Sequence, residues 1–277
     1  MKRVIITGST GLVGSRIVEL LHEKVHFISL SQPLVDITNM ESVKNALLSV
    51  EYDTILHLAA YTKVDEAEQE QESAHSVNVA GTQHIFTIAQ EQQKHMIFIS
   101  TDFVFDGIHP PFTENAVPHP LSIYGTTKYK AEKVVANDAM IVRISYPYKK
   151  YPSEKKDFVH KIKDQLSSGN TLRMVQDSLI TPTYIDDIAY ALYYLIEHFS
   201  PSIFHIVGAD ALSPYDAGVQ IARTFGLNEQ LIQPALFTEF FHNKAKRPQF
   251  SDIQSSKNTF FTMKTFEQGL AAFLQDS

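Results

Sequence analysis

Three glycines stand within seven residues near the start of the chain, in the stretch ITGSTGLVG, where Gly8, Gly11 and Gly14 repeat at intervals of three. The apolar run RVIIT precedes them at 3–7, and a helical pattern follows at 12–24. A strand that turns directly into a helix presents free N–H groups and a favourable dipole to a phosphate. We expect Gly8 to allow the tight turn, Gly11 the approach of a pyrophosphate, and Gly14 close packing of the helix on the strand. The stretch predicts a dinucleotide-binding unit; the other interpretation is an ordinary strand–turn–helix connection.

The rest of the sequence alternates short apolar runs with longer helical patterns. Such alternation is typical of βαβ units, and strands that are apolar almost throughout are typical of a sheet covered on both faces. We therefore predict an α/β fold, a Rossmann-type doubly wound parallel sheet with a smaller C-terminal substrate-binding lobe. The predicted strands are 3–7, 25–30, 53–60, 96–100, 140–145 and 203–208, and the predicted helices are 12–24, 39–50, 75–92, 121–137, 158–169, 184–199 and 213–226.

The alternation weakens after residue 145, where YPYKKYPSEKKD is rich in proline and lysine. We expect residues 1–145 to form an NAD(P)-binding Rossmann domain, to which the chain returns near 184–208. Residues 146–183 and 209–277 are expected to form the substrate-binding lobe.

Composition and charge exclude several classes of function. The chain has 277 residues, 44% of them hydrophobic, a net charge of −7 and no cysteine. These values give no support for binding nucleic acid, and no apolar run is long enough to span a membrane. Disulfide and zinc–thiolate chemistry are excluded, and the 12 histidines show no metal-ligand spacing, so no metal site is expected. A cytoplasmic protein is the expectation. Six lysines between 149 and 163 form a solvated face or attract a phosphate-bearing ligand.

The end of the second predicted strand bears on the choice of cofactor. An acid at this position would bind the adenosine ribose of NAD, but the sequence there is FISLSQP. Ser29 and Ser31 accommodate a 2′-phosphate without repulsion, although no arginine accompanies them. We therefore expect NADPH, with NADH as the alternative. Asp36 and Ile37 follow, and either flank the adenine or cap the next helix.

The stretch YGTTK places Tyr124 and Lys128 four residues apart, on one face of a predicted helix. A nearby ammonium favours the ionised phenol and so lowers the pKa of a tyrosine. This pair is suited to proton transfer; taken alone, it is also a common kind of surface pair.

With the glycine stretch and YGTTK in one chain, the sequence resembles the extended short-chain dehydrogenase/reductase family. It is most similar to the dTDP-4-dehydrorhamnose reductase branch, across nearly the whole chain. The segments that carry the resemblance are AAYTKVDEAE (59–68), VNVAGT (77–82), STDFVFDG (100–107), PFTENAVPHPLSIYGTTKYKAE (111–132), TPTYIDDIA (181–189) and RPQFSDIQSSK (247–257).

The resemblance implies a set of site residues in this chain. The implied catalytic residues are Thr101, Tyr124 and Lys128. The implied cofactor-binding residues are Gly8, Thr10, Gly11, Leu12, Val13, Gly14, Ser29, Asp36, Ile37, Leu58, Ala59, Ala60, Tyr61, Asn78, Ser100, Tyr124 and Lys128. The implied substrate-binding residues are Val64, Asp102, Phe103, Tyr146 and Arg247. Thr62 and Asp65 continue the wall that begins at Ala59.

The implied reaction is reduction of a nucleotide-linked 4-keto-6-deoxysugar, in the synthesis of cell-surface polysaccharide precursors. The chemistry agrees with the residues: Tyr124 gives a proton to the forming alkoxide, Lys128 tunes it, and Thr101 aims the carbonyl oxygen. Related dehydratases carry an Asp-Glu pair after the threonine, whereas Phe103 follows Asp102 here, so dehydration is disfavoured. A sugar-nucleotide epimerase with bound NAD and a non-catalytic NADP-binding regulatory subunit stay open.

Two departures from the family pattern affect the expectations. The branch carries a tryptophan after the strand that ends near residue 145, and this chain has Tyr146 there and no tryptophan. Arg16 stands where some members carry an acid of a metal-bridged dimer, so a dimer of that kind is not expected, although a homodimer stays open. Arg247 either clamps a nucleotide diphosphate or forms a surface salt bridge.

Overall fold

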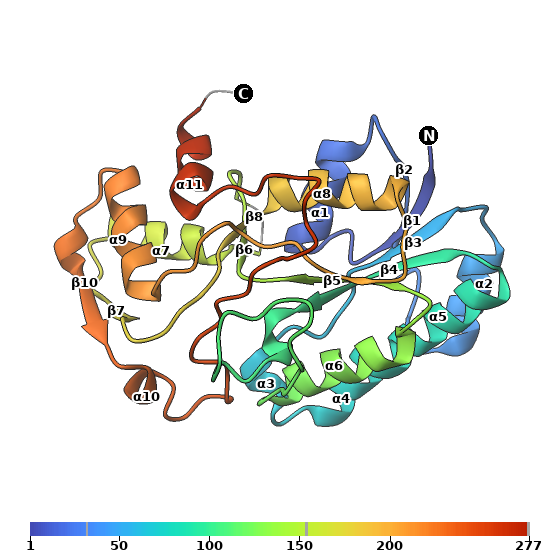
Figure 1. Ribbon diagram of the computed structural model, residues 1–277, viewed down its shortest axis with the longest axis horizontal. Coiled ribbons are helices and arrows are strands. Elements are labelled where there is room, and N and C mark those ends of the chain that lie inside the picture. Colours follow the sequence, from blue (N-terminus) through green and yellow to red (C-terminus); the bar gives the residue numbers. More distant parts are fainter. Residues whose placement is uncertain (32, 153–154, 276–277) are drawn as a thin grey trace.

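Six parallel strands form the central sheet of the computed structural model, which describes residues 1–31, 33–152 and 155–275 (Figure 1). They lie in the order β2-β1-β3-β4-β5-β9. Their bounds are β1 (Arg3–Thr7), β2 (His26–Leu30), β3 (Thr54–His57), β4 (His95–Thr101), β5 (Met140–Ile144) and β9 (Ile203–His205). The chain leaves β1 toward β2 on one side and returns through β3 on the other. Ligands of open α/β sheets bind beyond the carboxyl ends of the strands at such a reversal.

Helices cover both faces of this sheet (Figure 1). On one face lie α1 (Leu12–Leu21) and α8 (Ile185–Glu197), and on the other α2 (Met40–Leu48), α5 (Gly81–Glu91) and α6 (Ile123–Val135). Alternate residues of β1 enter the two cores: Val4 and Ile6 pack with α1 and α8, and Ile5 packs with the other helices. All three are fully buried. The predicted doubly wound α/β fold is confirmed.

The later segments build a smaller lobe beside the sheet (Figure 1). Its helices are α7 (Phe158–Ser167), α9 (Pro214–Thr224), α10 (Phe237–Phe240) and α11 (Phe266–Leu274). Two parallel pairs of short strands, absent from the sequence prediction, join them: β7 (Leu172–Val175) with β10 (Ile232–Ala235), and β6 (Pro147–Tyr148) with β8 (Thr183–Tyr184). Tyr148 and Phe266 are buried at the centre of this lobe, with ring centroids 5.2 Å apart. A short 3₁₀ turn, η3 (Glu229–Leu231), precedes β10.

The helix predicted over 75–92 begins earlier, at residue 71, and runs without a gap through three successive parts. These are α4 (Gln71–His75), a π-helical turn η1 (Ser76–Ala80) and α5, and the short α3 (Val64–Ala67) precedes them. The π turn contains Asn78, whose side chain accepts the Tyr61 N–H at 2.7 Å and donates to the Tyr61 carbonyl at 3.2 Å. Such turns are frequent at functional sites. Here the turn places an amide that fixes the backbone beyond β3.

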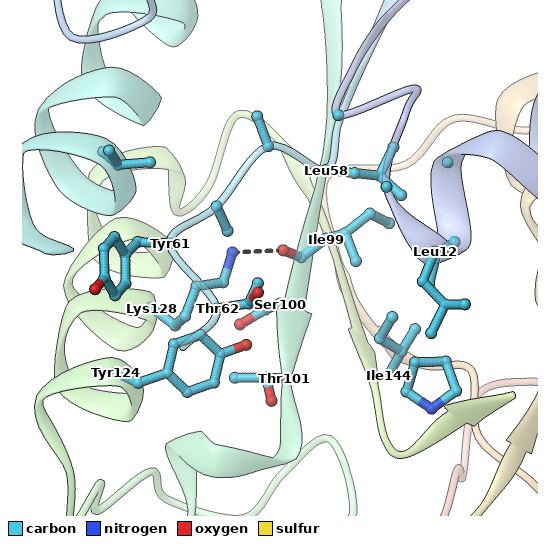
Figure 2. A pocket seen from close by; sticks show the side chains of 18 of the residues that line it. Leu12, Leu58, Tyr61, Thr62, Ile99, Ser100, Thr101, Tyr124, Lys128 and Ile144 are labelled. Atoms are coloured by element: carbon cyan, nitrogen blue, oxygen red, sulfur yellow. Dashed lines mark hydrogen bonds between the residues drawn. The ribbon is translucent and has the colours of Figure 1, made fainter. Parts of the chain in front are cut away.

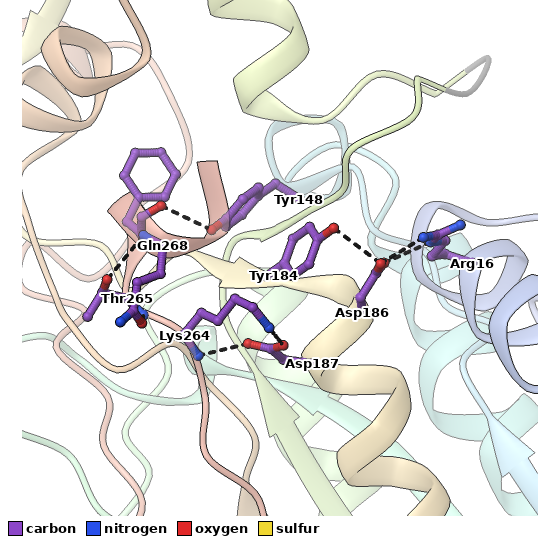
Figure 3. Close-up of polar contacts among 9 residues, drawn as sticks. Arg16, Tyr148, Tyr184, Asp186, Asp187, Lys264, Thr265 and Gln268 are labelled. Carbon is purple, nitrogen blue, oxygen red and sulfur yellow. Dashed lines mark hydrogen bonds and ion pairs between the residues drawn. The ribbon is translucent and has the colours of Figure 1, made fainter. Parts of the chain in front are cut away.

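Two charged contacts hold α8 in place (Figure 3). Asp186 accepts two 2.7 Å hydrogen bonds from the Arg16 guanidinium, which joins α8 to α1. Asp187 accepts hydrogen bonds from the Lys264 main chain at 2.8 Å and its ammonium at 2.6 Å. The Arg16 guanidinium therefore forms an ion pair within its own subunit.

Part of the range predicted for the lobe lies against the sheet domain. Phe260, Phe261 and Met263 pack on the core that contains α1 and α8. Ser255 and Ser256 donate hydrogen bonds to Glu114, whose carboxylate also accepts the N–H of His205 in β9. The assignment of 146–183 and 209–277 to a separate lobe stays a prediction. The segment 255–263 lies in this range but packs on the sheet domain, so it links the lobe to that domain. Within the described ranges, no helix has the length and apolar character needed to cross a bilayer.

Candidate active site

A cavity of about 740 Å³ opens beyond the carboxyl ends of the central strands. It spans the reversal between β1 and β3 and reaches the ends of β4 and β5. Its lining contains Gly8, Thr10, Gly11, Leu12, Val13, Gly14, Leu30, Ser31, Val35, Asp36, Ile37, Thr38, Leu58, Ala59, Ala60, Tyr61, Thr62, Val64, Val77, Ile99, Ser100, Thr101, Asp102, Phe103, Tyr124, Lys128, Ile144, Tyr146, Pro147 and Lys155. Most of the residues predicted for cofactor and substrate thus lie around one space.

The glycines make a tight cradle at one end of the cavity. Gly8 has φ +71°, a backbone conformation that residues with side chains rarely adopt, and a Cβ there would lie 2.8 Å from the Ala59 nitrogen. A Cβ on Gly14 would lie 2.3 Å from the Gly8 carbonyl oxygen. Gly11 is the N-cap of α1 and has no side chain to cover the free N–H groups of the first turn. The cradle is suited to a pyrophosphate.

The far end of this cavity is formed by the segment after β2. Ser31, Asp36 and Ile37 line it, but Ser29 does not. Ser29 lies inside β2, paired with Ile6, and its side chain is exposed away from the cavity. Of the two serines considered for the cofactor, Ser31 at the strand tip therefore lines the cavity and Ser29 does not. The Asp36 carboxylate accepts hydrogen bonds from Thr38, which lower its pKa.

The wall beyond β3 contains Leu58, Ala59, Ala60 and Tyr61 (Figure 2). Asn78 is absent from the lining and lies behind the wall, bonded to Tyr61 as described above and to the Thr127 hydroxyl at 2.9 Å. Its contact with the cofactor stays a prediction, and its observed hydrogen bonds hold the wall against α6.

Ser100, Thr101, Tyr124 and Lys128 meet where β4 ends beside α6 (Figure 2). The N-cap Ser122 accepts the Gly125 N–H at 3.1 Å and starts α6 just before the tyrosine. Gly125 is required there because a Cβ would lie 2.3 Å from the Phe103 carbonyl oxygen. The Ser100 hydroxyl is buried and has no hydrogen-bond partner in the described part of the chain.

The arrangement of Lys128 and Tyr124 differs from the predicted pairing of an ammonium with a phenol. The Lys128 ammonium donates to the Ile99 carbonyl at 2.7 Å, and burial lowers its pKa to about 7. Burial raises the pKa of the Tyr124 phenol to about 12, with the Thr101 hydroxyl opposing this shift and the Asp102 charge adding to it. In this structure the ammonium is thus held by a main-chain carbonyl, and burial is the main cause of the raised pKa of the phenol.

The residues predicted to bind substrate fall into two groups. Val64, Asp102, Phe103 and Tyr146 line the cavity. Phe103 contacts the Tyr124 ring edge to face at 5.5 Å between centroids, and Tyr146 has the unusual φ of +39°.

Arg247 makes up the second group and is absent from the lining. It pairs with Asp65 at the start of α3 and lies 4.2 Å from the centre of the Phe241 ring. It is close enough to Tyr146 for its charge to oppose the rise of that phenol's pKa. Arg247 thus lies at the rim, where it joins the lobe to the sheet domain.

Several lining residues were missed by the sequence analysis, including Ile99, Ile144 and Pro147, whose apolar side chains carry no distinctive signal. Lys155 was noted only as part of the lysine-rich stretch. Its ammonium donates to the Thr62 hydroxyl at 3.1 Å across the cavity rim. Within the described residues, no group of three or more His, Cys, Asp or Glu side chains is arranged to hold a metal ion.

Comparison with known proteins identifies the family. The RmlD substrate binding domain model matches residues 1–277. A dTDP-4-dehydrorhamnose reductase from Aggregatibacter actinomycetemcomitans is 31% identical, over 93% of this chain and 92% of its own length. Subunit beta of rat methionine adenosyltransferase 2 is 29% identical, over 92% and 81%. The crystal structure of dTDP-4-dehydrorhamnose reductase from Bacillus anthracis str. Ames in complex with NADP superposes with a TM-score of 0.92 at 31% identity, over 99% of this chain and 98% of that one. The chain belongs to the RmlD substrate binding domain family.

Proposed function

We propose that the protein catalyses the NADPH-dependent reduction of a nucleotide-linked 4-keto-6-deoxysugar, a step in the synthesis of cell-surface polysaccharide precursors. The observation that carries this proposal is the meeting of Thr101, Tyr124 and Lys128 with the glycine cradle around one cavity. The reductases among the relatives support the substrate class.

The residues present fit a dinucleotide. The glycine cradle excludes side chains where a pyrophosphate would bind, and the orphaned Ser100 hydroxyl offers a buried polar contact farther along the cavity. Ser31 would accommodate a 2′-phosphate at the tip of β2. When bound, NADPH supplies a hydride to the carbonyl carbon.

The chain's own residues supply the proton. With its pKa raised by burial, the Tyr124 phenol keeps its proton near neutral pH and can deliver it to the developing alkoxide. Thr101 lies beside it to orient the carbonyl oxygen. Lys128, one helical turn after Tyr124, would stabilise the phenolate left behind whenever it carries its charge.

The substrate would lie between Tyr124 and the lobe. Tyr146 takes the place where the family carries a tryptophan, and its ring packs edge to face on Phe158 with centroids 6.1 Å apart. Val64, Asp102 and Phe103 complete the wall around the sugar. Arg247 at the rim would exchange its bond to Asp65 for the nucleotide diphosphate.

Assembly and compartment stay proposals. The cytoplasm is proposed because the proposed cofactor and nucleotide sugars are intracellular metabolites, and a homodimer is to be tested by light scattering of the purified protein. The likeness to subunit beta of methionine adenosyltransferase 2 keeps a regulatory function as the second candidate. The presence of all three catalytic side chains in the cavity favours the reductase.

The decisive assay follows NADPH oxidation across a panel of nucleotide-linked 4-keto sugars, with NADH run in parallel. The proposal expects turnover with a 4-keto-6-deoxysugar and at least equal use of NADPH. NAD that stays bound through purification, together with interconversion of sugar epimers, would support an epimerase. Cofactor binding without turnover on any member of the panel would support the regulatory subunit.

A further inference from the structure

A buried carboxyl group lies directly beside the catalytic threonine. Asp102 opens a short 3₁₀ turn, η2 (Asp102–Val104), and is 3% exposed. One of its oxygens is 3.0 Å from the Thr101 hydroxyl, and the other accepts a hydrogen bond from the Ser251 hydroxyl. No ion pair to Asp102 is present among the described residues, so its surroundings are hydroxyl groups rather than cations.

The groups that face Asp102 come from several elements. The phenols of Tyr124 on α6 and Tyr146 after β5 are both close enough for the charge of Asp102 to raise their pKa. Ser251 belongs to the segment that returns from the lobe, and its main chain is fixed by Leu179 and by the Thr181 hydroxyl. Burial raises the pKa of Asp102 above its ordinary value, against the effect of the hydroxyls of Ser251, Ser145 and Thr101.

The Thr101 hydroxyl has only one proton to give. If Asp102 is ionised, that proton points to the carboxylate, while the Thr101 oxygen accepts the Phe103 N–H at 3.2 Å. Thr101 then has no proton left for a substrate carbonyl. If Asp102 is protonated, its O–H can donate to Thr101, which frees the threonine proton, and Ser251 can still donate to the second carboxyl oxygen.

We propose that Asp102 is a positioning residue that works in its protonated form, directing the Thr101 proton toward the substrate carbonyl. The chain of donors runs from Ser251 through the Asp102 carboxyl and the Thr101 hydroxyl to the carbonyl oxygen beside Tyr124. Successive hydrogen bonds in such a chain strengthen one another. This inference rests on the proposed reductase function, and it also ties the lobe, through Ser251, to the reacting centre.

The test compares two replacements of Asp102. In Asp102→Asn, the amide can donate to Thr101 and accept from Ser251 as the protonated acid does, whereas Asp102→Leu can do neither. We expect Asp102→Leu to lower kcat about a hundredfold, as for loss of a donor to the developing oxyanion. Asp102→Asn should be at least tenfold faster than the leucine variant and should lose the alkaline decline of kcat that Asp102 ionisation causes in the wild type. NADPH affinity, measured by fluorescence, should be unchanged in both.

An asparagine variant as slow as the leucine variant, in a folded protein, would show that the ionised carboxylate is needed and would overturn the proposal. A second readout does not depend on turnover. Because the folded-state pKa of Asp102 is raised, the wild type loses stability relative to Asp102→Asn as the pH rises through that pKa. In urea denaturation, the free energy of unfolding of Asp102→Asn relative to the wild type should therefore be higher at pH 8 than at pH 5. An equal difference at both pH values contradicts a protonated Asp102, even if Asp102→Leu does not fold or the wild type reduces no sugar.

Discussion

The Lys128 ammonium donates a 2.7 Å hydrogen bond to the main-chain carbonyl of Ile99 and lies 4.0 Å from the centre of the Phe98 ring. The side chain is 3% exposed, and in the described part of the chain it forms no ion pair. Glu132, one turn later on α6, favours the charged form, but its carboxylate is already bound by the Arg143 guanidinium. The charged lysine is therefore costly to bury, and the proposed mechanism gives its charge a use at this site.

Replacing this lysine should separate stability from activity. Burial lowers the Lys128 pKa from 10.5 to about 7. At a pH where the lysine is charged in both the folded and the unfolded state, this shift corresponds to a loss of folding stability of about 5 kcal/mol. After subtraction of the lost hydrogen bond to Ile99, Lys128→Met should raise the free energy of unfolding by about 2 to 3 kcal/mol at pH 6. NADPH affinity and turnover should both fall.

The pH dependence of the increase in the free energy of unfolding expected for Lys128→Met provides the control. Between pH 7 and 10.5 the unfolded state binds more protons than the folded one, so the wild type becomes more stable as the pH rises. The advantage of Lys128→Met should therefore be largest below pH 7 and shrink by pH 9 in urea denaturation. A methionine variant that is less stable than the wild type at pH 6 would contradict the assigned cost.

Alanine substitutions at two glycines of the cradle should have different effects on stability and on cofactor binding. Gly14→Ala should cost about 1 to 3 kcal/mol, because its Cβ would overlap the Gly8 carbonyl oxygen at 2.3 Å. Gly11→Ala should cost little, since its Cβ meets only that oxygen, at 3.1 Å, and its φ is an ordinary −74°. Thermal unfolding with and without NADPH should show a normal melting temperature for Gly11→Ala but a smaller shift on adding cofactor. An undiminished shift would place the pyrophosphate elsewhere.

The ion pair between Arg247 and Asp65 should set the affinity for substrate. Arg247→Ala should raise KM for the nucleotide sugar about tenfold or more with little change in kcat, as for loss of a charged hydrogen bond that is equal in ground and transition states. Asp65→Asn should lower KM, because the guanidinium is released. Arg173→Ala, which breaks an exposed pair with Glu239 in the lobe, is the matched control and should change neither constant. An Arg247→Ala enzyme with unchanged KM would remove Arg247 from the substrate site.

The strands and helices around the sheet could be predicted because their signals are local. The glycines, the apolar runs and the YGTTK helix each depend on neighbours in sequence, and all lie where they were expected. The π turn at Asn78 could not be predicted, because the helical pattern continues through it and only the tertiary contact with Tyr61 reveals it.

The direction of the side chains accounts for most differences between the predicted and the observed site. Ser29 and Ser31 are equivalent as sequence letters, but only the one beyond the strand end reaches the cavity. The i, i+4 spacing brings Lys128 to the same face as Tyr124, yet the nearby Ile99 carbonyl takes the ammonium. Arg247 was expected at the substrate, and the contact that holds it at the rim comes from Asp65, 182 positions away in the chain.

The central claim is that Tyr124 donates the proton in a reduction, and stopped-flow measurement of NADPH oxidation with a nucleotide-linked 4-keto-6-deoxysugar tests it most directly. Tyr124→Phe should keep the fold and the NADPH affinity and lower the rate about a hundredfold or more. Tyr129→Phe, on the same helix but outside the cavity lining, should react at the wild-type rate. Full turnover by Tyr124→Phe on a substrate that the wild type reduces would contradict the account.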